Sequence, residues 1–156
     1  MKIRRAIKKD VPQIINLIAD IWAEYDCILD TEKEEKYLLA PEDYFHSKDG
    51  EFWVVAERNE IVGTVAVIML GETTAELKSL YVGKNFRNQG LGENLTKLAV
   101  KFASLKGRSE IILWSDTRFI EAHKLYEKIG FKRLGERELD DINKSSEFGY
   151  KRNTYM

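Results

Sequence analysis

Apolar residues recur at intervals of three and four in three segments, which predicts amphipathic helices at residues 11–25, 93–105 and 118–129. Asp10 and Pro12 stand at the start of the first segment, where a capping side chain and a first-turn proline favour helix initiation. Lys106-Gly107 and Gly130 follow the other two segments, as is typical of helix ends.

The remaining apolar runs have the spacing of strands. A short strand is predicted at residues 1–7, and the runs EFWVVAER, IVGTVAVIML and TAELKSLYV indicate an antiparallel meander over 51–83. We expect its connections at Asn59-Glu60 and around Gly71. The apolar run at 109–115 is typical of a buried strand. Residues 131–140 and 146–156 are predicted to close the fold as a pair of strands around the polar turn DINKSS.

Residues 26–46 follow neither pattern. This segment carries seven acidic residues against two basic ones, and we expect Pro41 to interrupt whatever helix forms there. Such a segment favours a cationic ligand, but a solvated charged helix face explains the composition equally well.

Composition narrows the class of protein. A chain of 156 residues fits one domain, which we expect to span residues 1–156. With 25 basic and 26 acidic residues the chain has no net positive charge that would attract a polyanion, so nucleic acid is not expected as a partner. No apolar run reaches the roughly 18 residues that span a bilayer, and Cys27 is the only cysteine. We therefore expect a cytoplasmic protein without a membrane partner.

The stretch FRNQGLG joins the third strand of the meander to the helix at 93–105. Glycine in a helix interior costs roughly 1 kcal/mol relative to alanine, so Gly90 and Gly92 require another explanation. A glycine turn at a helix start presents free N–H groups and the positive end of the helix dipole, which favours a phosphate. Arg87 adds a fork of donors suited to a diphosphate. A tight turn without any ligand is the alternative.

At these residues the chain resembles the GNAT superfamily of acyl-CoA-dependent N-acyltransferases. The signature R/Q-x-x-G-x-G/A is matched by Arg87, Gly90 and Gly92, and the segment L-Y-x-K-x-G-F by residues 125–131 without a gap. The chain differs from common members at Val82-Gly83-Lys84, where many have V-x-P, and at Phe119, where many have an asparagine.

The resemblance implies the architecture and the co-substrate. It implies an α/β (α+β) fold with a mixed, mainly antiparallel sheet of about seven strands flanked by four helices. It also implies transfer of the acetyl group of acetyl-CoA to a primary amine, by direct attack through a tetrahedral intermediate. The residues expected to bind coenzyme A are Leu80, Tyr81, Val82, Arg87, Asn88, Gln89, Gly90, Leu91 and Gly92. Ordinary strand pairing remains the alternative role for the backbone of the first three.

Two side chains are candidates for proton transfer. Alternation places Glu76, Lys78, Leu80 and Val82 on one face of their strand, so Glu76 is our candidate base, with a bound water as the alternative. Tyr126 matches the family tyrosine that donates to the leaving sulfur, and core packing is its alternative role. No metal is expected, because His46 and His123 are isolated in the sequence.

The acceptor and the rival functions complete the sequence-based expectations. In the family, the segment after the first helix shapes the acceptor site, so a small-molecule or peptide amine of cationic character is favoured. Cys27 is interpreted as a packed residue rather than a nucleophile. A non-catalytic acyl-CoA sensor and a nucleotide-dependent oxidoreductase are the rival functions. Pairing through the closing strands is common among relatives, so a homodimer is also expected as an assembly.

Overall fold

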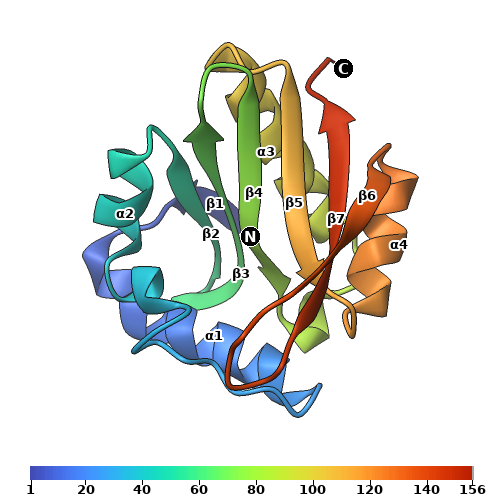
Figure 1. Cartoon of the computed structure of the whole chain (residues 1–156). Helices are drawn as coiled ribbons and strands as arrows, with labels where there is room; N and C mark the ends of the chain where they lie inside the picture. The colour runs from blue at the N-terminus through green and yellow to red at the C-terminus, as the bar shows by residue number, and fades with distance from the viewer. Residues whose placement is uncertain (156) are drawn as a thin grey trace.

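The computed structural model describes residues 1–155 as one sheet with helices on both faces (Figure 1). The strands are β1 (Lys2–Arg5), β2 (Glu51–Glu57), β3 (Glu60–Leu70), β4 (Thr74–Val82), β5 (Glu110–Asp116), β6 (Lys132–Glu138) and β7 (Ser146–Asn153). The α-helices are α1 (Val11–Ala23), α2 (Pro41–Ser47), α3 (Leu91–Leu105) and α4 (Ile120–Lys128). Short 3₁₀ turns are η1 (Lys8–Asp10), η2 (Lys36–Leu39) and η3 (Lys84–Phe86).

The seven strands follow the order β1-β2-β3-β4-β5-β7-β6. Neighbouring strands are antiparallel except for β4 and β5, which are parallel and are connected by α3. The mixed, mainly antiparallel sheet of seven strands flanked by four helices is therefore confirmed.

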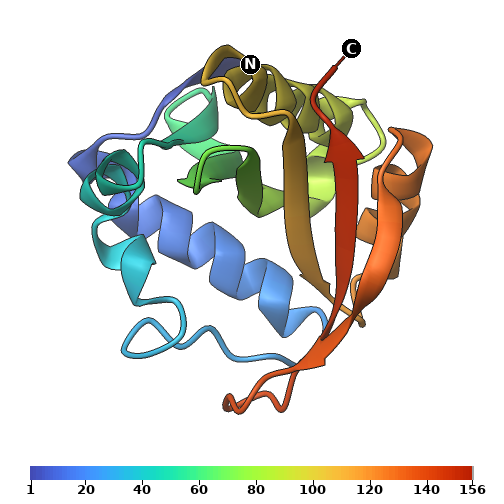
Figure 2. The same cartoon turned by 45° about the horizontal axis from the view of Figure 1, so that its top comes forward.

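Each face of the sheet has its own hydrophobic core. On one face the apolar stripe of α3, including Leu95 and Ala99, packs on the sheet together with Tyr126 of α4. On the other face Ile14 and Ile18 of α1 pack on the sheet together with Phe45 of α2. Full burial of such side chains contributes about 1.5–3 kcal/mol each, so the two helical stripes fix the helices to opposite faces, as Figure 2 shows.

Two connections differ from the prediction. The hairpin between β2 and β3 turns at Arg58 and Asn59, with φ of 52° and 70°, and Glu60 already pairs with Glu57. A two-residue hairpin of this type needs positive φ at both central residues, which moves the predicted Asn59-Glu60 turn back by one position. Pro41 begins α2 rather than interrupting a helix, because a proline at the first helical position loses no hydrogen bond.

Some boundaries also shift. Helix α1 ends at Ala23 and α3 begins at Leu91, two residues before the predicted start. The Asp10 side chain does not cap α1; it accepts the Ile7 N–H at 2.9 Å and pairs with Arg4 at 2.7 Å. Met156, the end of the predicted last strand and domain, lies outside the described residues.

A β-bulge in β4 overturns the predicted alternation of that strand. Lys78 pairs with Ala66 and Tyr81 with Thr64, so β4 has one residue more than β3 between these pairs, and Ser79 there has a φ of 53°. The extra residue reverses the direction of the side chains that follow. Leu80 and Val82 consequently pack on the α3 side and do not share a face with Glu76 and Lys78.

Candidate active site

The candidate site lies where β4 and β5 separate. The two strands pair only from Thr74–Glu76 to Glu110–Ile112 and then diverge toward their carboxyl ends (Figure 1). A cavity of about 840 Å³ opens at this divergence, lined by β4, β5, the start of α3, α4 and the segment after α1. The predicted site residues line this cavity except for Gln89, which is exposed in the same turn.

The turn that begins α3 explains the two glycines separately. Gly90 is the N-cap residue with φ of 81°, a conformation that costs residues with a Cβ roughly 1–2 kcal/mol. A Cβ at Gly92 would lie 3.1 Å from Leu125 Cδ2, so this glycine allows α3 and α4 to approach. Gly90 has no side chain to accept the first N–H groups of α3, and Gly90, Leu91 and Gly92 line the cavity, so uncapped helix-start donors belong to its lining residues.

Arg87 is held by the protein itself. Its two terminal nitrogens donate to the Glu24 carboxylate at 2.8 Å each, and its Nε donates to the Val82 carbonyl at 3.0 Å. The hydrogen bonds from Arg87 hold the pKa of Glu24 below its usual value. The guanidinium fork predicted for a diphosphate is thus engaged in joining the end of α1 to β4.

Tyr126 and Glu76 lie in different walls of the cavity. The Tyr126 ring packs between Phe131 and Tyr150, with centroid distances of 5.8 Å and 5.6 Å. Burial raises the pKa of Tyr126, so its hydroxyl is protonated at neutral pH. Glu76 precedes the bulge in β4, and its carboxylate lies 3.6 Å from Lys78 Nζ. That nitrogen lies 5.3 Å from the centre of the Tyr37 ring.

The segment after α1 supplies residues that the sequence pattern did not single out. Glu35 and Tyr37 line the cavity, and in the sequence Glu35 is one of the seven acidic residues of this segment. Glu35 is 6% exposed, and burial together with nearby carboxylates raises its pKa to about 7. Burial alone distinguishes this carboxylate from the neighbouring ones. The segment has no hydrophobic periodicity from which that burial could be predicted.

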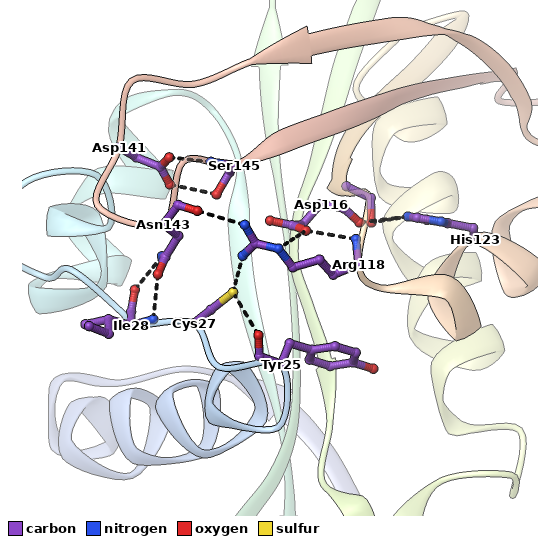
Figure 3. Close-up of polar contacts among 10 residues, drawn as sticks. Tyr25, Cys27, Ile28, Asp116, Arg118, His123, Asp141, Asn143 and Ser145 are labelled. Atoms are coloured by element: carbon purple, nitrogen blue, oxygen red, sulfur yellow. Dashed lines mark hydrogen bonds and ion pairs between the residues drawn. The ribbon is translucent and has the colours of Figure 1, made fainter.

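Three segments meet at the end of the cavity next to the β6–β7 hairpin (Figure 3). The Asn143 side chain accepts the Ile28 N–H and donates to the Ile28 carbonyl, both at 2.8 Å. Arg118 donates to the Asn143 carbonyl at 2.7 Å and to the sulfur of Cys27. The β6–β7 hairpin, the β5–α4 connection and the segment after α1 are therefore tied together, and Cys27 is a buried residue of this junction.

Phe119 also has a local explanation. Its ring packs on Tyr25 with a centroid distance of 4.8 Å, and it lines the cavity at the start of α4. An apolar contact thus stands at the position where the family that the sequence resembles commonly has an asparagine.

Two classes of feature are absent from residues 1–155. Within that range, no cluster of three or more His, Cys, Asp or Glu side chains is arranged to hold a metal ion. None of the helices described there is long and apolar enough to cross a membrane.

Comparison with known proteins identifies relatives of this chain. A family model described as "Acetyltransferase (GNAT) family" matches residues 14–131. The N-acetylaspartate synthetase of Danio rerio is 34% identical over 120 residues, which cover 76% of this chain and 41% of that protein. The chain thus spans less than half the length of this curated relative.

Solved structures share the fold. A GNAT-family acetyltransferase from Staphylococcus aureus Mu50 superposes with a TM-score of 0.86 at 23% identity, covering 99% of both chains. An aminoglycoside 6'-N-acetyltransferase solved in complex with coenzyme A superposes with a TM-score of 0.74 at 18% identity. That match covers 100% of this chain and 98% of the other.

Proposed function

The chain belongs to the GNAT family of acetyltransferases, and we propose that it transfers the acetyl group of acetyl-CoA to a primary amine. The observation that carries this proposal is the turn at Gly90, whose helix-start donors lie on the rim of the cavity between β4 and β5. A phosphate-binding turn next to separated strands offers both a site for the diphosphate and a place for the rest of the carrier.

The residues of this turn fit a diphosphate. A Cβ at Gly90 would meet nothing within 4 Å, so the space beside this residue of the turn is open. Backbone donors of the turn hold the phosphates in this proposal, and they come from Arg87, Asn88, Gln89, Gly90, Leu91 and Gly92. The Arg87 side chain supports the turn through Glu24 instead of reaching the phosphates.

The backbone of Leu80, Tyr81 and Val82 holds the pantetheine arm. Because β5 has left β4 at this point, a bound chain can lie along β4 like an added strand. N–H groups of the same segment also stabilise the developing oxyanion. The similar aminoglycoside acetyltransferase contains coenzyme A, which supports this choice of co-substrate.

The reaction needs one acceptor and one donor of protons from the chain. The amine nitrogen bonds to the carbonyl carbon and the carbon–sulfur bond breaks. Glu76 takes a proton from the amine, directly or through a water, and Tyr126 gives a proton to the departing sulfur. Burial raises the pKa of Tyr126, so its hydroxyl is protonated at neutral pH, and after the transfer it regains a proton from solvent while Glu76 releases the one it took from the amine.

The acceptor in this proposal is a small molecule or a peptide with a primary amine and cationic character. The acidic lining near the segment after α1 supports this class. The proposal also includes one cytoplasmic domain and a homodimer through β6, whose residues are exposed along its whole length.

Calorimetry with acetyl-CoA and thiol release with a panel of amines test the proposal together. We expect saturable binding of acetyl-CoA and amine-dependent release of free thiol. Binding without release for any amine would favour the acyl-CoA sensor. A thermal-shift comparison that shows stabilisation by nicotinamide dinucleotides but not by coenzyme A would favour the oxidoreductase instead.

A further inference from the structure

Glu35 is a buried carboxylate in the cavity wall with one oxygen left without a partner. The residue is 6% exposed and lines the cavity. Its Oε1 accepts a long contact from the Asp30 N–H at 3.5 Å. Its Oε2 is buried and, among residues 1–155, has no hydrogen-bond partner. An ionised carboxylate in this position costs folding free energy unless a cation reaches it.

The charges around Glu35 increase its need for a cation. Burial is the first cause of its raised pKa, and repulsion from Asp30, Glu34 and Asp141 adds to it. These carboxylates come from its own segment and from the β6–β7 hairpin, so two elements of the wall present negative charge to the same place.

The cationic side chains that line this end of the cavity already have partners. Lys78 is paired with Glu76 and lies over the Tyr37 ring. Arg137 pairs with Glu147 at 2.8 Å and lies 4.2 Å from the centre of the Trp114 ring. The charge that Glu35 lacks is therefore one that a ligand in the cavity can bring.

We propose that Glu35 binds a second, non-reacting cationic group of the acceptor, so that the preferred acceptors are diamines. This inference rests on the proposed acetyltransferase function. One amine of such a molecule is acetylated near β4, while the other stays protonated and donates to Oε2 of Glu35. A hydrogen bond to a charged group contributes about 1.5–3 kcal/mol, which corresponds to roughly 10-fold to 150-fold in affinity.

The proposal separates this chain from an aspartate-acetylating enzyme. The similar protein from Danio rerio is named N-acetylaspartate synthetase, and aspartate carries two carboxylates beside its amine. An anionic acceptor would place its charge against Glu35 and Asp141 in the same cavity. Like charges that face one another in one cavity disfavour binding.

The test compares three acceptors of one chain length, diaminobutane, butylamine and aminobutyrate, with wild type and Glu35→Gln. We expect wild type to prefer diaminobutane in kcat/KM over the other two, by at least about tenfold. In Glu35→Gln we expect that preference to disappear through a higher KM for diaminobutane, while kcat/KM for butylamine changes less than about threefold. If Glu35 were instead the general base for all acceptors, Glu35→Gln would lower the rate with every amine equally.

Glu32→Gln is the matched control. Glu32 is exposed on the same segment and does not line the cavity, so its neutralisation changes the segment's charge without changing the wall. We expect it to keep the diamine preference, and circular dichroism melting checks that both variants fold.

The other outcomes contradict either the role of Glu35 or the acetyltransferase function. A wild type that turns over amines without preferring the diamine, or that prefers aminobutyrate, overturns the role of Glu35. Equal losses with all acceptors in Glu35→Gln also overturn it. No thiol release with any amine contradicts the acetyltransferase function itself.

Discussion

Tyr126 combines a packed ring with a hydroxyl on a cavity wall, so its two candidate roles can be separated by removing one atom. Tyr126→Phe keeps the ring contacts with Phe131 and Tyr150 and removes only the proton donor. We expect kcat to fall by about 10- to 100-fold, at or below the lower limit of the roughly 100- to 10,000-fold effect of a general acid, because a thiolate is already a tolerable leaving group. Thermal melting and the KM for acetyl-CoA should stay close to wild type. An unchanged kcat would assign Tyr126 to the core alone.

Glu35 also makes a prediction about stability. Its pKa of about 7 in the folded chain is above the ordinary value of 4.5, so the folded state holds this proton more tightly than the unfolded state. The carboxylate therefore costs nothing below the unfolded pKa, and its cost grows as the pH rises from the unfolded pKa to the folded pKa. Glu35→Gln removes that cost.

The stability difference between Glu35→Gln and wild type should consequently depend on pH. From about pH 4.5 to about pH 7 the variant should gain up to about 3 kcal/mol in free energy of unfolding relative to wild type. Urea unfolding at several pH values measures this difference. A difference that stays constant over the range would show that Glu35 is not desolvated as described.

At the scale of the element, the proposed phosphate site at the start of α3 can be tested with two matched glycine variants, one at each end of the helix. Gly90 and Gly107 have φ of 81° and 80°, and a Cβ at either would meet nothing within 4 Å. A side chain therefore costs the same backbone strain at both positions. Gly90 lines the cavity, whereas Gly107 follows the far end of the same helix.

Gly90→Glu should abolish detectable binding of acetyl-CoA while the domain remains folded, because a carboxylate there repels a diphosphate and occupies its space. Gly107→Glu should lose a similar amount of stability and keep its affinity for acetyl-CoA. Calorimetry gives the affinities and urea unfolding gives the stabilities. Equal acetyl-CoA affinity in both variants would contradict a phosphate site at this turn.

At the scale of the whole molecule, the β6–β7 hairpin and the segment after α1 are joined at Ile28 and Asn143 (Figure 3). Asn143→Ala removes two hydrogen bonds, each worth about 0.5–1.5 kcal/mol net. The β6–β7 hairpin then loses its link to the segment after α1 at the end of the cavity where we propose that the acceptor binds. We expect the KM for the amine to rise several-fold while the KM for acetyl-CoA stays unchanged, because the turn at Gly90 is not part of this junction.

Lys144→Gln provides the control for this prediction. Lys144 is the neighbouring exposed residue of the hairpin, so the variant changes the surface charge but not the link to Ile28. Steady-state kinetics with both substrates measures the effect. A higher KM for acetyl-CoA in Asn143→Ala would show that the effect of the junction is not confined to the amine. An equal rise in the KM for the amine in Lys144→Gln would show that the link to Ile28 is not its cause.

Most helices and strands were predictable because their causes are local. The stripe of α3 buries residues three and four apart, and Gly107 ends that helix where glycine tolerates positive φ. The β2–β3 turn shifted to Arg58 and Asn59 because the pairing of Glu57 with Glu60 sets which two residues take positive φ, and that register involves both strands.

The site divides in the same way. By itself the sequence determined the apolar stripes of α1 and α3, the glycine turn before α3 and the family motifs around Arg87 and Tyr126, since each depends on residues close together in the chain. Tertiary structure alone decided the reversal of Leu80 and Val82 after the bulge and the isolation of Glu35 in the cavity wall. It also decided that Arg87 pairs with Glu24. Register, burial and pairing depend on segments distant in the sequence, and a pattern within one segment carries no information about which partner it will meet.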